Sequence, residues 1–161
     1  MCRTIINVDT GQLKCASGNS VLEVLALGSC IAVCVIDVKR LNACLAHIML
    51  PGKAPANSGK RKNKYSENAL DGIFKWAKEN KISKGNIKIF IVGGGNVLKR
   101  EGDNIAHNNI EAVIRGIKQR NMKITAQLLG GTVRRSIKVD MKNRKIFCVE
   151  GDSGRKITWQ I

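Results

Sequence analysis

Two apolar runs near the start of the chain constrain its fold most. They are IAVCVI, residues 31–36, and CLAHIML, residues 44–50, and they are bounded by Asp37, Asn42 and Pro51. Continuous apolar runs of this length between turn-forming residues are typical of β-strands. The sequence therefore predicts two neighbouring strands joined by a turn between Asp37 and Asn42.

Helical and strand patterns fill most of the remaining chain. Apolar residues recur at helical spacing in residues 66–79, which Ser66 can cap, and in residues 104–120. Further strands are predicted at residues 4–8, 21–27, 87–92, 123–129, 134–141, 145–150 and 156–161. Strands before, between and after only two helices favour an α+β domain with a mixed or largely antiparallel sheet. No repeat or linker divides residues 1–161, so we expect a single domain.

Length and composition limit the class of protein. A chain of 161 residues is about one domain, and no apolar stretch approaches the roughly 18 residues of a membrane span. The N-terminal segment lacks the apolar region and cleavage site of a secretory signal, so we expect a cytoplasmic protein without membrane insertion. In a reducing cytoplasm the cysteines are expected to be thiols, most of them buried; they are Cys2, Cys15, Cys30, Cys34, Cys44 and Cys148.

The chain is strongly basic, with 28 Lys and Arg against 12 Asp and Glu and a net charge of +16. Such a charge attracts nucleic acid, anionic membranes or acidic proteins. The aromatic content of 4% and the lack of zinc-finger or RNA-recognition spacing argue against nucleic acid. Residues 52–64, GKAPANSGKRKNK, carry part of the charge and predict a flexible basic loop.

Glycine runs after two of the predicted strands do not fit a nucleotide site. Gly93-Gly94-Gly95 lacks both the third glycine of a dinucleotide fingerprint, where Leu98 stands, and the Gly-Lys-Ser/Thr of a P-loop. We expect a tight turn in which two backbones approach closely, and we interpret Gly130-Gly131 in the same way.

Strand geometry argues against a metal site among the cysteines and His47. Cys30, Cys34, Cys44 and His47 have the residue types of a Cys₃His zinc set. Along a strand, however, about 13 Å separates Cys30 from Cys34, and Cys44 and His47 face opposite sides. One zinc ion cannot collect all four, so we expect no metal.

Cys30 and His47 form a candidate catalytic pair. Cys30 follows a Gly28-Ser29 turn at the start of one apolar run, and His47 lies within the next run. A thiol nucleophile needs a neighbouring imidazole base, and backbone N–H groups of residues 28–30 could stabilise an oxyanion. The residues alone leave open a simply buried thiol and a hydrogen-bonded core histidine.

Five segments, in order, resemble the CheD family of chemoreceptor glutamine deamidases. They extend from about Leu25 to Ile137 and read LGSCIAVCVID with AHIMLP, KYSENAL, IFIVGGGNV, NIAHNNIEAV and LLGGTVRRSI. The resemblance implies that Cys30 is the nucleophile and His47 the base. It further implies hydrolysis of glutamine side chains on the cytoplasmic helices of methyl-accepting chemotaxis receptors to glutamate and ammonia, without a cofactor or metal.

The resemblance also bears on fold and partners. It implies a compact α+β domain with packed sheets and helices outside. Some family members bind CheC-type phosphatases, which compete with the receptor for the same face, so such a phosphatase is a possible second partner here.

Several positions depart from the family pattern. A threonine that orients the histidine stands five or six residues before the family cysteine, whereas this chain has Leu25 and Val24 there. Ala106 and Arg134 replace motif glycines. We therefore keep a second hypothesis, a weak or non-catalytic basic binding protein of the same fold that docks on a receptor, a CheC-type phosphatase or nucleic acid. The intact cysteine and histidine motifs favour the enzyme.

Overall fold

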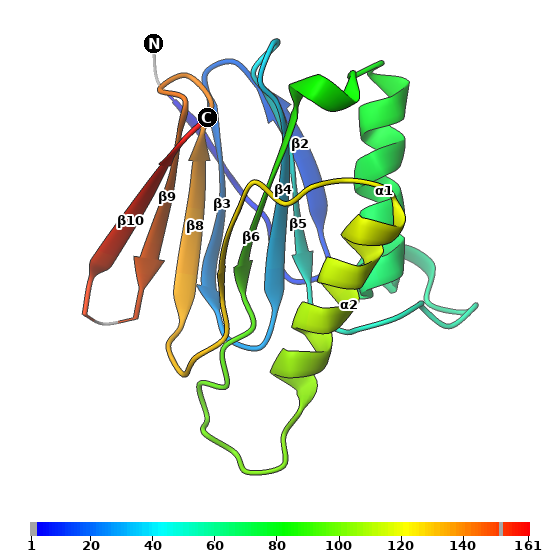
Figure 1. Ribbon diagram of the computed structural model, residues 1–161, viewed down its shortest axis with the longest axis vertical. Helices are drawn as coiled ribbons and strands as arrows, with labels where there is room; N and C mark the ends of the chain where they lie inside the picture. Colours follow the sequence, from blue (N-terminus) through cyan, green and yellow to red (C-terminus); the bar gives the residue numbers. More distant parts are fainter. Residues whose placement is uncertain (1–2, 152) are drawn as a thin grey trace.

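A computed structural model describes residues 3–151 and 153–161, and within them the chain forms two five-stranded sheets and two α-helices (Figure 1). The first sheet has the strand order β1–β3–β8–β9–β10 and the second β2–β5–β4–β6–β7. Only β1–β3 and β6–β7 pair in parallel among the described strands, so both sheets are mixed and largely antiparallel, as predicted.

The bounds of the elements follow the chain. The strands are β1 (Thr4–Asn7), β2 (Leu13–Ser17), β3 (Ser20–Leu27), β4 (Ile31–Asp37), β5 (Asn42–Ile48), β6 (Ile87–Gly93), β7 (Ala126–Leu129), β8 (Arg135–Asp140), β9 (Lys145–Glu150) and β10 (Arg155–Gln160). The helices are α1 (Ser66–Glu79) and α2 (Ile105–Gln119), with short 3-10 helices η1 (Gly59–Lys64) and η2 (Lys84–Asn86).

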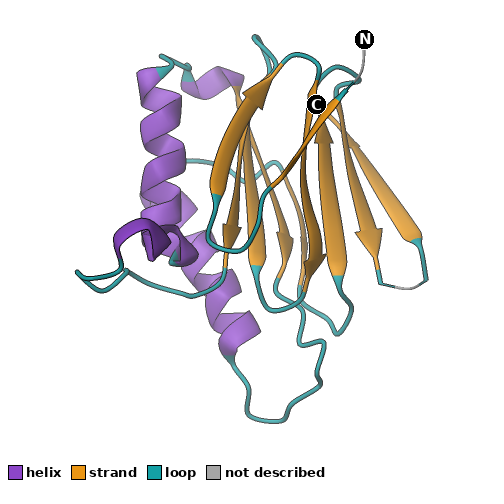
Figure 2. Cartoon of the chain, turned by 180° about the vertical axis from the view of Figure 1, so that it is seen from behind, coloured by secondary structure: helices purple, strands orange, loops and turns teal. Residues whose placement is uncertain are grey.

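The elements stack in three layers, with the second sheet in the middle (Figures 1 and 2). One apolar core lies between the two sheets and includes Leu22, Phe90 and Ile137. A second core lies between the middle sheet and the helices and includes Leu70 and Val113. The expected fold class, an α+β domain with packed sheets and helices outside, is confirmed.

Strand β4 explains why the middle sheet can be covered on both faces. Ala32 and Cys34 point into the core between the sheets, whereas Ile31 and Val33 point toward the helices. Successive side chains of a strand alternate between faces, so a strand with an apolar residue at nearly every position can be buried on both. All seven residues of β4 are buried.

Helix α1 begins at the predicted residue, but its predicted cap is wrong. The cap position is Tyr65, and no side chain caps the helix. The Ser66 hydroxyl is buried and instead accepts a hydrogen bond from the Gly52 N–H at 2.9 Å. A buried hydroxyl needs a partner, and the preceding loop supplies it.

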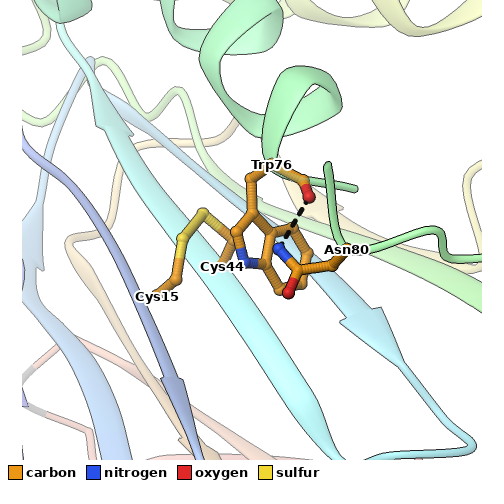
Figure 3. The surroundings of a disulfide bond; sticks show 4 residues. All are labelled: Cys15, Cys44, Trp76 and Asn80. Carbon is orange, nitrogen blue, oxygen red and sulfur yellow. Dashed lines mark hydrogen bonds between the residues drawn. A yellow bond between two sulfur atoms is a disulfide. The ribbon is translucent and has the colours of Figure 1, made fainter. Parts of the chain in front are cut away.

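The expectation that the cysteines are thiols is wrong for two of them. Strand β2, which the sequence did not predict, pairs with β5 and places Cys15 directly opposite Cys44, with their Cα atoms 4.0 Å apart. The two sulfurs form a disulfide beside Trp76 of α1 (Figure 3). Cys30, Cys34 and Cys148 are free thiols, the last two buried, and Cys2 lies outside the described residues.

Two further expectations concern the basic segment 52–64 and membrane insertion. Residues 59–64 of the basic segment 52–64 form η1, so that part of the loop has helical turns that the sequence did not indicate. Among the described residues, no helix has the length and apolar character needed to cross a membrane.

Replacing Cys15 tests the disulfide. Because Cys15 is exposed, Cys15→Ala opens no cavity and removes only the cross-link between residues 29 apart. We expect the free energy of unfolding to fall by about 3 kcal/mol, since the unfolded chain regains loop entropy. Urea unfolding measures the change. A reductant should destabilise the original protein to a similar extent and leave the variant unaffected; equal stability of variant and oxidised protein would contradict the prediction.

Candidate active site

The candidate site residues meet at one end of the middle sheet, the lower end in Figure 1. The turn from β3 to β4 carries residues 28–30, and it lies beside the glycine turn that ends β6. The glycine turn after β7 joins them, since the Gly130 N–H donates to the Gly93 carbonyl at 3.0 Å.

The turn that carries Cys30 is held by its carbonyl groups. The Gly95 N–H donates to the Gly28 carbonyl and the Gly94 N–H to the Cys30 carbonyl, each at 2.9 Å. The Asn109 side chain on α2 donates to the Ser29 carbonyl, also at 2.9 Å. Three successive carbonyl groups are therefore fixed by groups from β6 and α2.

The glycine run is a site of close backbone approach, as predicted. Gly93 has φ +126°, and a Cβ there would lie 2.1 Å from the Cys30 carbonyl oxygen. A Cβ on Gly94 would meet the Ile110 side chain at 2.5 Å. Only glycine allows this backbone conformation and this spacing.

In the described part of the chain, two N–H groups of this turn, those of Ser29 and Cys30, are not used to hold it. Within residues 3–151 and 153–161, no hydrogen bond is donated by the N–H of Ser29 or of Cys30. Backbone N–H groups of this kind can stabilise negative charge on an oxygen atom. The turn thus presents a thiol together with two unused donors.

Asn109 links the Cys30 turn to the strand of His47. Its Nδ2 donates to the Met49 carbonyl at 2.9 Å in addition to the Ser29 carbonyl. Met49 directly follows β5, and Asn109 is fully buried. Asn109 lies within the segment NIAHNNIEAV, whose sequence indicated no role for this side chain.

His47 is buried on β5, and its ring has a defined hydrogen bond. Nδ1 lies 3.1 Å from the Val8 carbonyl oxygen. Because a carbonyl only accepts, Nδ1 must carry the proton, which leaves the Nε2 lone pair free to act as a base. Of the two positions expected for the family threonine, Val24 is buried in the core between the sheets, and Leu25 is exposed and lines the same cavity as His47. Here the ring is oriented by Val8, which nothing in the sequence indicated.

The register places Cys30 and His47 on the same face of neighbouring strands. Ala32 of β4 pairs with His47 of β5, and Cys30 lies two residues before Ala32. Diagonal neighbours of this kind have Cα atoms about 7 to 8 Å apart, within reach of long side chains. In the described residues no hydrogen bond joins the Cys30 thiol to the His47 ring.

The four residues weighed as a zinc set are not brought together. Cys44 packs in the core on the helix side of the sheet, whereas Cys34 packs on the other side. Cys44 is also joined to Cys15. His107, on the solvent side of α2, lies near Glu111.

Burial shifts the pKa values of Cys30 and His47 in opposite directions. Loss of solvent raises the pKa of the Cys30 thiol above its ordinary value. Loss of solvent lowers the pKa of His47, and the bond to Val8 and the Asp9 charge only partly oppose this effect. Both shifts favour the uncharged forms, so the resting pair at neutral pH is a thiol and a neutral imidazole.

Two cavities lie near the candidate residues, one beside the turn that precedes Cys30 and one beside His47. One, of about 260 Å³, is lined by Gly28 and Ser29 together with residues 95–98 and 103–106. The residues that line the other cavity include His47, Val8 and Thr10. Between them, β3 has a register shift against β8 between Val24 and Leu27.

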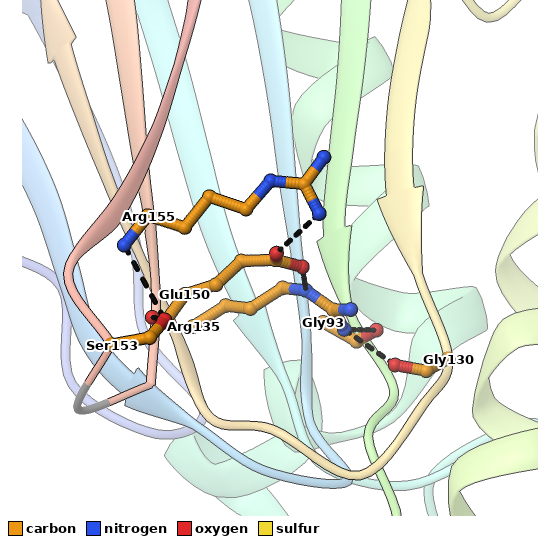
Figure 4. Close-up of polar contacts among 6 residues, drawn as sticks. All are labelled: Gly93, Gly130, Arg135, Glu150, Ser153 and Arg155. Atoms are coloured by element: carbon orange, nitrogen blue, oxygen red, sulfur yellow. Dashed lines mark hydrogen bonds and ion pairs between the residues drawn. The ribbon is translucent and has the colours of Figure 1, made fainter.

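A buried ion pair of the first sheet, Arg135 with Glu150, holds the glycine turns that follow β6 and β7. Arg135 donates from Nε to Glu150 at 3.0 Å and from Nη1 to the carbonyl groups of Gly130 and Gly93, at 2.6 and 3.4 Å (Figure 4). Arg155 adds a second contact to Glu150 at 3.4 Å. A buried pair of this kind is sensitive to loss of either partner, because the other charge is then left unpaired.

Fold and site together define a class of protein. The protein is an α+β domain that carries a thiol, a neutral imidazole and free N–H groups at one end of a sheet. These groups are suited to nucleophilic attack on a carbonyl carbon, so the class is that of cysteine hydrolases.

Comparison with known proteins identifies the family. Residues 49–158 match the family CheD, described as CheD chemotactic sensory transduction. The chain is 37% identical to the probable chemoreceptor glutamine deamidase CheD of Chlorobium luteolum, over 89% of this chain and 72% of that protein. It is 26% identical to the chemoreceptor glutamine deamidase CheD of Thermotoga maritima, over 93% and 94%. The chain belongs to the CheD family.

The ionisation of Cys30 is open to a direct test. Alkylation by iodoacetamide requires the thiolate, so its rate should rise with a midpoint above the ordinary value of about pH 8.5. Peptide mass mapping follows Cys30 and uses buried Cys148, whose pKa is raised to about 12, as the internal control. A midpoint in the acidic range would mean a thiolate–imidazolium pair instead.

Replacing Asn109 tests the link between the turn and β5. Asn109→Ala leaves the Ser29 and Met49 carbonyl groups without their donor, and we expect unfolding to become easier by about 1 to 3 kcal/mol. The exposed neighbour Asn108 provides the matched control, Asn108→Ala, in urea unfolding. Equal stability of the two variants would contradict a positioning role.

Proposed function

We propose that this protein hydrolyses glutamine side chains of chemoreceptors to glutamate, with release of ammonia. The observation that carries the proposal is the placement of Cys30 and His47 on one face of adjacent strands, with the His47 Nδ1 proton held by Val8. The names of the relatives, chemoreceptor glutamine deamidases, supply the substrate. The specific segments proposed are the cytoplasmic helices of methyl-accepting chemotaxis receptors.

Acylation begins with proton transfer. His47 Nε2 takes the thiol proton as Cys30 Sγ attacks the carboxamide carbon of the glutamine. The hydrogen bond between Sγ and Nε2 that this step needs forms when substrate is bound, since catalytic hydrogen bonds commonly tighten at that stage. The carbonyl oxygen becomes an oxyanion, which the Ser29 and Cys30 N–H groups stabilise. His47 then gives the proton to the departing nitrogen, and ammonia leaves a thioester on Cys30.

Deacylation uses the same groups in reverse. His47 removes a proton from water, the resulting hydroxide attacks the thioester carbon, and the carbon–sulfur bond breaks. Cys30 recovers its proton from His47, and the product is a glutamate side chain. The lowered pKa of His47 keeps the imidazole in its basic form at neutral pH.

Two features of the cellular setting are part of the proposal. The protein acts in the cytoplasm, where the substrate helices lie, although disulfides such as Cys15–Cys44 are uncommon in that compartment. A CheC-type phosphatase is proposed as a second partner that competes with the receptor for the face around Cys30.

The activity is tested with a receptor cytoplasmic fragment. Each glutamine hydrolysed adds about one dalton, which mass spectrometry detects. Cys30→Ala should abolish the gain, and His47→Gln should slow it by about a hundredfold or more, since a general base contributes that much. His107→Gln, on the exposed side of α2, is the matched control and should leave the rate unchanged.

The binding-protein hypothesis makes the opposite prediction. Under it, the intact protein binds the fragment without any gain in mass, and Cys30→Ala binds equally well. No mass gain with several well-folded receptor fragments would contradict the proposed activity.

A further inference from the structure

Arg134 is a cationic side chain without a partner beside the proposed nucleophile. It is exposed and lines the same cavity as Gly28 and Ser29, the two residues before Cys30. Across residues 3–151 and 153–161, its guanidinium takes part in no hydrogen bond and no ion pair. The neighbouring arginine, Arg135, is by contrast buried, and its Nε and Nη1 groups donate hydrogen bonds.

The backbone of Arg134 is nevertheless firmly placed. Its carbonyl accepts a hydrogen bond from the Gly151 N–H at 2.6 Å, and the next residue is held by Glu150, Gly130 and Gly93. A free guanidinium on a fixed base can bind a ligand at a defined distance from the site with little ordering of the chain.

The cavity has a distinct pattern of charge. Ala26, Val97 and Leu98 contribute apolar surface, and Asp103 contributes one carboxylate. Asp103 uses Oδ1 to accept the Ile105 N–H at 3.0 Å, and it forms no ion pair with Arg134. In this cavity the guanidinium of Arg134 therefore attracts an anion, and the carboxylate of Asp103 repels one.

We propose that Arg134 is a specificity-determining residue, which binds the carboxylate of a glutamate or aspartate near the target glutamine in the substrate polypeptide. The proposal rests on the proposed function and adds a sequence requirement to it. A guanidinium is the side chain best suited to planar, two-point recognition of a carboxylate. Asp103 lines the same cavity, and its carboxylate disfavours an acidic side chain placed next to it rather than next to Arg134.

The size of the effect follows from the exposure of Arg134. Exposed ion pairs are worth little, and partial exclusion of water by the substrate strengthens them. We expect an acidic neighbour to improve binding by about tenfold. The gain should appear in KM rather than kcat, because the carboxylate does not take part in the reaction.

Binding of helical peptides, each with one central glutamine, tests the proposal. One series carries a glutamate three, four or seven residues to either side, and matched series carry alanine or lysine at the same places. Fluorescence anisotropy with the Cys30→Ala protein measures binding without turnover, and mass spectrometry with the active protein measures hydrolysis.

Three further variants complete the design. The acid preference should disappear in Arg134→Ala, and Arg134→Glu should prefer the lysine series. Arg115→Ala removes the same charge from the exposed side of α2 and should keep the preference. An unchanged preference in Arg134→Ala, or an equal loss for all three series, would overturn the proposal.

The two proposals can fail separately. If no peptide is hydrolysed but the acid preference in binding depends on Arg134, the deamidase proposal fails and the recognition role stands. If the peptides are hydrolysed with equal KM in all series, the activity stands and the role of Arg134 is wrong.

Discussion

Contact between two tight turns fixes the candidate site, and much of this end of the molecule depends on it. The glycine turn after β6 approaches the Cys30 carbonyl so closely that a Cβ on Gly93 would lie 2.1 Å from its oxygen. Hydrogen bonds from Gly94 and Gly95 then direct the carbonyl groups of the Cys30 turn toward β6. Because peptide N–H and carbonyl groups point in opposite directions, this contact also sets where the free amide groups of the turn can point.

The three-layer arrangement gives that contact its rigidity. The middle sheet is covered on one face by the first sheet and on the other by the helices (Figures 1 and 2). Each of the two outer layers contributes one side chain to the site end. Arg135 comes from the first sheet and ties the glycine turns, and Asn109 comes from α2 and ties the Cys30 turn to the end of β5. Neither residue reacts in the proposed mechanism, and both act through the backbone.

His47 illustrates how a carbonyl group can do what the family pattern assigns to a side chain. The Val8 carbonyl accepts a hydrogen bond from the Nδ1 proton, so the tautomer that the proposed mechanism requires is set without a hydroxyl at Val24 or Leu25. Burial keeps the ring neutral, and its pKa is lowered accordingly. The absence of the family threonine therefore does not leave the ring without an orienting partner.

The sequence by itself determined both α-helices and every described strand except β2, and it indicated Cys30 and His47 as candidate reactive residues. The apolar run of β4 required burial on both faces, and the positions of Cys30 and His47 on adjacent strands followed from the short turn between those strands. The pairing of Cys15 with Cys44, the Val8 contact and the role of Asn109 could not be predicted, because each joins segments that no local pattern connects. Only the tertiary structure decided them, since this disulfide needs its two cysteines on paired strands and a hydrogen bond to a backbone carbonyl depends on where the chain passes and not on the type of the accepting residue.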